Sequence, residues 1–348
     1  MFNFEITICI ITYNRGKRAL ENVNNILTQI NNEWCVLVLN NGSNLEVNFY
    51  DEIKNLSEIN SQLFYVRHPI NIQIHGNFRS CFDYAKSRYI MILSDEDFIN
   101  SDGLFSTLSI LKFYEKVGVC RPSIAPHPEL ITPGNSYVFQ DNYFIGGNAA
   151  LNGFAFVGNY ISGVIYNVEL IKNMGLLEVY DRKIIAHRNY PHLYLDLLVS
   201  SKLDVLITSN VTVLERKGEE TLIENGTSSV ASKHIGLYGY GERINQFLAL
   251  RDAVREVVDL SDLNTDSEKI KLFIELNLLL ISKYFYLIFK VNITNYTSNS
   301  MERNLLLDSF FYLVCSSILT HPYIGNHDEL VANQIVEIYE GYKREFAC

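Results

Sequence analysis

Four short apolar runs, each followed by polar residues, constrain the fold of this chain more than any other feature. The runs occupy residues 6–11, 35–39, 63–66 and 89–93. Uninterrupted apolar runs of this length are typical of strands that are buried on both faces. Segments with helical periodicity lie between the runs, at residues 20–30, 49–59 and 77–87. Strands that alternate with helices predict an α/β fold with a mostly parallel central sheet flanked by helices.

Three of these runs end in polar clusters, at residues 12–15, 40–43 and 94–97. The carboxyl ends of parallel strands share one edge of a sheet, and ligands bind at that edge where the strand order reverses. The third cluster contains a D-x-D pattern formed by Asp95 and Asp97. Two carboxylates at this spacing suit a hard divalent cation that also binds diphosphate oxygens. A solvated acidic turn is the alternative interpretation of the same residues.

The second half of the chain has a different character. Residues 119–215 are rich in Gly and aromatic side chains and contain short strand-like pieces. From about residue 235 onward, long segments have helical periodicity, at 244–258, 268–291, 301–319 and 329–346. We therefore predict a sheet-based domain over residues 1–215, followed over residues 216–348 by a linking loop and a C-terminal helical subdomain.

Composition and missing motifs disfavour several classes of protein. The 348 residues include 29 basic and 39 acidic ones, so a nucleic-acid partner is not expected, because phosphate binding needs clustered Lys and Arg. No G-x-G-x-x-G or Walker motif occurs, which disfavours dehydrogenases and P-loop enzymes. The six cysteines form no C-x-x-C pair, as expected of buried free thiols in a reducing compartment. Because no signal-peptide pattern and no long uncharged apolar run occur, we expect a cytoplasmic location.

Three segments together resemble family 2 glycosyltransferases of the GT-A type. They are residues 6–15 (ITICIITYNR), 36–43 (VLVLNNGS) and 76–98 (GNFRSCFDYAKSRYIMILSDEDF). Residues 159–166 are similar to the segment that such enzymes place near the donor sugar and the acceptor. The arrangement most resembles bacterial abequosyltransferase-like enzymes that build surface polysaccharides, and it covers about residues 1–215. The resemblance implies a GT-A (Rossmann-like) fold and inverting transfer from a nucleotide-sugar donor.

The resemblance also implies roles for individual residues. The implied nucleotide-binding residues are Thr12, Tyr13, Asn14, Asn40, Asn41, Arg79, Asp95 and Glu96. The implied ligands of a divalent cation (Mn or Mg) are Asp97, Asp95 and His234. Asn40 and Asn41 occupy the position where the family usually has two Asp residues that read the base. This amide-for-carboxylate change keeps an acceptor and adds donors, which leaves the base preference open. Arg79 either contacts the donor or is a surface charge.

The general base is the part of the site where the sequence departs most from the family. The family usually has a Glu-Asp pair after the donor-sugar segment, and the matching residues 190–196 lack it. His192 lies closest to the expected place, and its imidazole suits base chemistry. Asp196 and Asp181 are rival candidates, and Asp196, one helical turn from His192, could orient the imidazole. A packing role for His192 is the alternative.

Several functional questions stay open at this stage. The expected partners are the nucleotide-sugar donor and a glycan or lipid-linked acceptor of O-antigen, capsule or lipooligosaccharide synthesis. The apolar segment 270–291 is interpreted in three ways: contact with the inner face of the cell membrane, a homodimer interface through the C-terminal helices, or the core helix of a bundle. A nucleotidyltransferase and a non-catalytic scaffold with a transferase fold are the alternatives to a glycosyltransferase.

Overall fold

The computed structural model describes residues 4–128, 137–158, 160–182, 190–216, 240–288 and 300–346. The strands are β1 (Phe4–Thr12), β2 (Trp34–Asn40), β3 (Leu63–Arg67), β4 (Ser87–Ser94), β5 (Phe98–Ile99), β6 (Val117–Pro126), β7 (Asn142–Phe144), β8 (Ile165–Asn167) and β9 (Asp204–Glu215). The helices are α1 (Gly16–Leu27), α2 (Val47–Ile59), α3 (Gln73–Tyr84), α4 (Ser101–Leu111), α5 (Asn148–Phe154), α6 (Val168–Asn173), α7 (Leu176–Asp181), α9 (Pro191–Ser200), α11 (Tyr240–Leu260), α12 (Asp266–Tyr286), α14 (Ser300–Leu319) and α15 (Asp328–Phe346).

The described strands form one sheet in the order β3-β2-β1-β4-β8-β6-β9-β5, with β7 beside β9. Strands β3, β2, β1 and β4 run parallel, whereas β8 pairs antiparallel with both β4 and β6. The chain passes from β1 outward to β2 and β3 and then returns to place β4 on the other side of β1. This reversal of strand order creates a switch point between the carboxyl ends of β1 and β4. The predicted mostly parallel, GT-A-like sheet flanked by helices is confirmed.

The alternation of side chains along the central strands explains why both faces of the sheet are covered. In β1, Ile6, Ile8 and Ile10 face a core that they share with the apolar residues of α1, α2 and α4. Cys9 of the same strand faces the opposite core, which contains apolar residues of α3 and α9. Because every one of these β1 side chains is fully buried, the run could only form a central strand.

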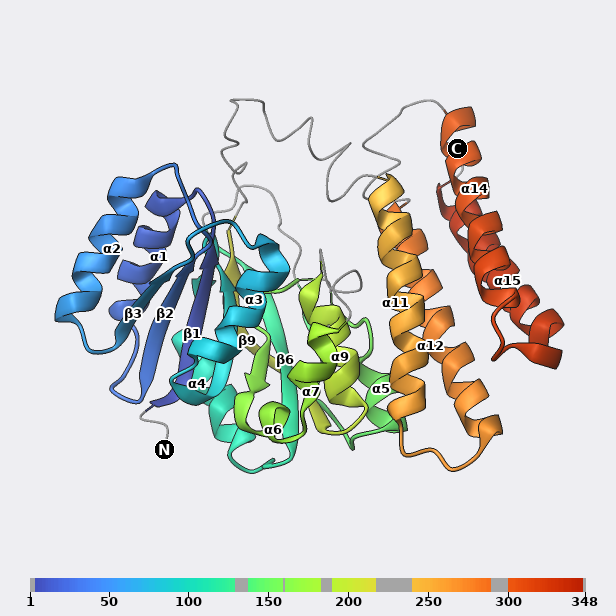
Figure 1. Cartoon of the computed structure of the whole chain (residues 1–348), viewed down its shortest axis with the longest axis horizontal. Helices are drawn as coiled ribbons and strands as arrows, with labels where there is room; N and C mark the ends of the chain where they lie inside the picture. Colours follow the sequence, from blue (N-terminus) through green and yellow to red (C-terminus); the bar gives the residue numbers. More distant parts are fainter. Residues whose placement is uncertain are drawn as a thin grey trace.

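The C-terminal helices pack on the second of these cores. Helix α11 contacts α9 and α12, and α12 also contacts α5 and α15, so the helices form a block beside the sheet in Figure 1. A capping box of Thr265 and Glu268 begins α12. Its apolar residues Phe273, Leu276 and Tyr284 are fully buried, which makes α12 a core helix of this block.

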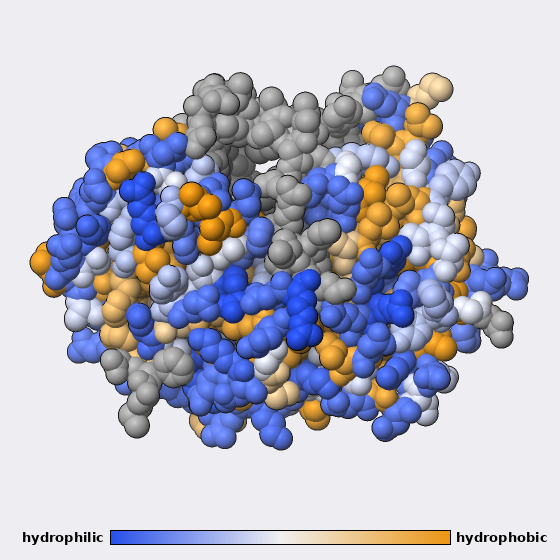
Figure 2. All heavy atoms as spheres, viewed as in Figure 1, coloured by the Kyte–Doolittle hydropathy of each residue, from blue (hydrophilic) through white to orange (hydrophobic). Residues whose placement is uncertain are grey.

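The outer helices leave part of their apolar surface exposed. Figure 2 shows apolar residues among polar ones over the helical block, and Met301, Leu305, Tyr312 and Leu330 are exposed large hydrophobic residues of α14 and α15. Within the described part of the chain, none of the helices combines the length and the apolar character needed to cross a membrane.

Candidate active site

The turn after β1 is held at the switch point by a tyrosine from α2. The hydroxyls of Thr12 and Tyr50 form a hydrogen bond of 2.8 Å, and the backbone N–H of Arg15 donates to the Tyr50 hydroxyl at 3.0 Å. Burial raises the pKa of Tyr50, which therefore stays a neutral phenol that can donate and accept at once. Thr12 is buried and Tyr13 is half-buried beside it. This turn was predicted from the sequence, but Tyr50 was not.

Asn14 joins the turn after β1 to the turn after β2. Its backbone adopts a φ of 56°, a left-handed conformation that asparagine tolerates better than most residues. The Asn14 N–H donates to Ser43 Oγ at 2.8 Å. The Asn14 Oδ1 atom accepts from the backbone N–H groups of Asn44 and Leu45 at 2.9 and 3.1 Å. The side chain predicted to bind nucleotide thus holds two loops together at the carboxyl edge of the sheet.

Asn40 and Asn41 use their amide groups to hold neighbouring segments in place. Asn40 Nδ2 donates to the Tyr65 hydroxyl at 2.9 Å, while Asn40 Oδ1 accepts from the Ser43 N–H at 2.8 Å. Asn41 Nδ2 donates to Asn71 Oδ1 and to the Gln73 carbonyl, and Asn41 Oδ1 accepts from a backbone N–H between them. An ionised Asp has no donor, so it could not make the bond from Asn41 to the Gln73 carbonyl. At Asn41, the amide in place of the Asp that the resemblance implies therefore has a structural reason.

Arg15 binds both of the first two acidic residues after β4. Its Nη1 donates to Asp95 Oδ1 at 2.9 Å, and its Nη2 donates to Glu96. Burial raises the pKa of Asp95 to about 6, and the charge of Arg15 opposes that shift. Arg15 belongs to the T-Y-N-R segment that carried the resemblance, but the sequence did not show that it would face these carboxylates.

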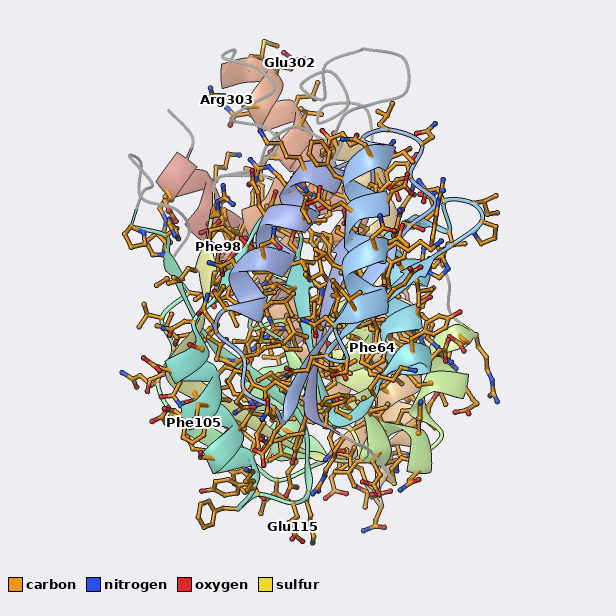
Figure 3. The ribbon with its side chains drawn as sticks, turned by 90° about the vertical axis from the view of Figure 1, so that its left-hand side faces the viewer. Phe64, Phe98, Phe105, Glu115, Glu302 and Arg303 are labelled. Atoms are coloured by element: carbon orange, nitrogen blue, oxygen red, sulfur yellow. The ribbon has the colours of Figure 1, made fainter. Side chains whose placement is uncertain are left out.

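Asp97 is the most enclosed acidic group of the site. Ser162 Oγ donates to its carboxylate at 2.6 Å, the Tyr160 hydroxyl contacts both oxygens at 2.8 and 2.9 Å, and the Arg216 N–H donates at 3.3 Å. Burial raises the pKa of Asp97 to about 7, although the hydrogen bond from Ser162 lowers it. The Arg216 guanidinium lies 4.4 Å from the ring of Phe98, which Figure 3 shows beside α1.

The chemistry of these groups fits a divalent cation in part. Asp95 and Asp97 offer oxygen ligands of the kind that Mg²⁺ and Mn²⁺ prefer. The described residues include no cluster of three or more His, Cys, Asp or Glu side chains placed to hold a metal ion. Two carboxylates leave coordination positions for diphosphate oxygens and water, as is usual for magnesium at phosphate sites. His234, the third implied ligand, lies outside the described residues.

The predicted pairing of His192 with Asp196 is not what the structure shows. Asp196 Oδ2 accepts from Arg121 Nη2 at 2.6 Å, and Asp196 Oδ1 accepts from the Tyr166 hydroxyl at 2.7 Å. Both carboxylate oxygens are therefore engaged away from the imidazole, because the buried guanidinium of Arg121 needs a counter-charge. The expectation that Asp196 orients His192 is corrected accordingly.

His192 itself is a buried residue of α9, with 1% of its surface exposed. Neither of its ring nitrogens makes a hydrogen bond of regular geometry among the described residues, although the backbone of Gly158 faces the ring. Burial, followed by the charge of Arg121, lowers the pKa of His192 well below its usual range. The imidazole is thus neutral at pH 7, the form that accepts a proton, but it is enclosed.

Arg79 and Asp181 bind each other. Arg79 Nε donates to Asp181 Oδ1 at 3.0 Å, and Arg79 Nη1 donates to Asp83 Oδ1 at 2.6 Å. The Asp181 side chain is 48% exposed. The structure thus joins a predicted donor contact and a predicted base into one ion-paired cluster between α3 and α7.

The comparisons with known proteins bear on the family and on the fold. Residues 7–168 match the family described as glycosyl transferase family 2. A comparison with curated proteins gave no match. The fold is similar to residues 1–349 of TarS from S. aureus, with a TM-score of 0.57 to its complex with UDP and 0.56 to its complex with UDP-GlcNAc. The identities are 11% and 12%, and both alignments cover 98% of this chain and 92% of that chain.

A mannosyltransferase from Pyrobaculum calidifontis, solved with GDP-Man and Mn²⁺, is also similar, with a TM-score of 0.47 and 12% identity over 99% of this chain and 87% of that chain. The family match contains the turn after β1, the D-x-D and the β8 strand. Residues 7–168 therefore match the family that the motifs resemble, and the resemblance is confirmed over that segment.

Proposed function

We propose that this protein is an inverting glycosyltransferase of bacterial surface polysaccharide synthesis. It would move a sugar from a nucleotide-sugar donor to a hydroxyl of a glycan or lipid-linked acceptor, on the inner face of the cell membrane. One observation carries the proposal: within the matched segment, the turn after β1 and the acidic residues after β4 meet at the switch point, joined by Arg15 and Asp95. Nucleotides bind at such points in α/β sheets.

We propose a separate role in donor binding for each group of residues at the switch point. Thr12, Tyr13 and Asn14 would border the nucleotide, and Asp95, oriented by Arg15, would face the ribose and diphosphate. Asp97 and Asp95 would hold a divalent cation, with His234 as a further ligand. When bound, the cation would offset the negative charge that develops on the leaving diphosphate. The hydroxyls of Tyr160 and Ser162 hold the Asp97 carboxylate in one orientation.

For the general base, we retain His192 in the proposal. Burial keeps its imidazole neutral, whereas the carboxylates of Asp196 and Asp181 both form ion pairs with arginines. An acceptor hydroxyl can reach His192 only if the chain around it opens, because the side chain is 1% exposed. A fall in kcat without loss of nucleotide affinity on mutation of His192 would support the assignment.

A donor screen tests the proposed function. The melting temperature of the protein is measured with UDP, GDP, dTDP and CDP, each with Mn²⁺ or Mg²⁺. The sugar derivatives of any stabilising nucleotide are then assayed for release of the diphosphate. UDP-GlcNAc is the first donor to assay, because TarS is known in complex with it. Stabilisation by one nucleoside diphosphate with a divalent cation, followed by release of that diphosphate from its sugar derivative, is the expected result. Stabilisation by triphosphates alone would favour a nucleotidyltransferase, and no nucleotide effect at millimolar concentration would favour a scaffold.

A further inference from the structure

A short stretch of chain connects the C-terminal helices to the site aspartate. Residues 156–158 and 160–162 run from the end of α5 toward β8, and at the far end Tyr160 and Ser162 hydrogen-bond to Asp97. At the near end, Lys283 Nζ of α12 donates to the Phe156 carbonyl at 2.6 Å. This hydrogen bond joins parts of the chain that are far apart in sequence, since 127 positions separate Lys283 from Phe156.

The conformation at Phe156 needs support. Its φ is 60°, in the left-handed region that bulky side chains rarely adopt. The Phe156 side chain is buried, so the backbone cannot relax by turning the ring into solvent. A hydrogen bond from an amine to the Phe156 carbonyl fixes this peptide in its unusual orientation.

A second basic side chain binds the same stretch. Arg121 Nη1 donates to the Tyr160 carbonyl at 3.0 Å, and its guanidinium is itself fixed by Asp196. Burial lowers the pKa of Lys283 to about 7, and Arg121 contributes to this change. Placing an amine in this desolvated position beside a guanidinium is unfavourable, which the bond to the Phe156 carbonyl offsets.

We propose that Lys283 is a positioning residue of the transferase site, which fixes residues 156–158 and 160–162 so that Tyr160 and Ser162 present their hydroxyls to Asp97. The proposal rests on the proposed function for its consequence in catalysis, but not for its structural part. Lys283 touches no reacting group. It acts through the chain that it holds, and it makes the helical region a contributor to the geometry around the carboxylates.

The test compares Lys283→Met, which keeps an unbranched side chain one atom shorter but removes the donor, with Lys283→Arg, which keeps a donor. Val257→Ala, a cavity variant in the buried face of α11, is the control for general loss of stability. Hydrogen exchange of peptides covering residues 156–164 reads the positioning directly. The affinity of UDP with Mn²⁺, measured by calorimetry, reads its effect on the site.

The expected result is faster exchange confined to residues 156–164 in Lys283→Met, with a roughly tenfold weaker Mn²⁺-dependent UDP affinity. Lys283→Arg should restore most of both, and Val257→Ala should change neither. Unchanged exchange in Lys283→Met overturns the proposal, as does changed exchange with unchanged UDP affinity. If UDP does not bind the unmutated protein, the donor assignment fails, and the exchange result alone still decides whether Lys283 positions this stretch.

Discussion

The metal-free protein should become less stable as the pH rises, because the buried carboxyl of Asp97 then loses its proton. Burial raises the pKa of this carboxyl from 3.8 to about 7. The folded state therefore binds the proton more tightly than the unfolded state. The stability gained by that binding is fully present below pH 3.8 and is lost progressively as the pH rises from there through about 7. Asp97→Asn keeps the shape of the side chain and removes the titration.

The size of the effect follows from the shift. Each pH unit between the two pKa values changes the free energy of unfolding by about 1.4 kcal/mol. From pH 5 to pH 8 the titration of Asp97 spans about two of these units, so the unmutated protein should lose about 3 kcal/mol relative to Asp97→Asn. Asp95 titrates in both proteins and cancels from the difference.

Urea unfolding in EDTA at pH 5, 6, 7 and 8 measures this difference. The single tryptophan, Trp34, is 2% exposed in β2 and reports unfolding by its fluorescence. Asp51→Asn, at an exposed position of α2, is the matched control and should follow the unmutated protein at every pH. If the unmutated protein and Asp97→Asn lose stability in parallel from pH 5 to pH 8, Asp97 does not titrate in this window and the burial argument is wrong.

Two further predictions concern the buried polar side chains on and around α9. Arg121→Met should destabilise the fold by about 3–5 kcal/mol in urea unfolding, because it leaves the Asp196 carboxylate buried without its counter-charge. Adding Asp196→Leu should recover much of this loss. If the double variant shows no recovery, the loss comes from packing and not from the unpaired charge. His192→Gln should lower kcat about 10²-fold or more with the nucleotide-induced melting shift unchanged, and an unchanged rate would remove His192 from the reaction.

The central half of the fold could be predicted because its strands are long, apolar and buried on both faces. The expected runs 6–11 and 89–93 lie inside β1 and β4. Strands β5, β7 and β8 have two or three residues each, too few to show any periodicity, so sequence reasoning could not place them. Their antiparallel pairing depends on where the chain returns to the sheet.

The site was predictable only where its residues follow a strand directly. The D-x-D and the turn after β1 had that signal. The partners of these residues did not, since Tyr50 is 38 positions from Thr12, and Tyr160 is 63 positions from Asp97. Asp196 was misjudged for the same reason: its nearest sequence candidate was one helical turn away, whereas its partner Arg121 lies 75 positions earlier.

The boundary predicted near residue 215 separates types of secondary structure, and it stays a prediction as a boundary between domains. One hydrophobic core contains Cys9 and Leu37 of the sheet together with Phe247 and Leu280 of the C-terminal helices. The helices also reach the chain that leads to Asp97, through Lys283. We therefore expect damage to α12 to be felt at the carboxyl edge of the sheet.

The two aspartates of the D-x-D differ in how their charge is balanced, and this difference indicates a division of labour. Asp95 forms an ion pair with the guanidinium of Arg15, which also binds Glu96. Asp97 receives its hydrogen bonds from two hydroxyls and a backbone amide, which stabilise an anion without cancelling it. A buried carboxylate held in this way is stable either when protonated or when a cation lies beside it. We therefore expect Asp97 to gain more than Asp95 from a divalent cation, and Asp95 to accept hydrogen bonds from a nucleotide.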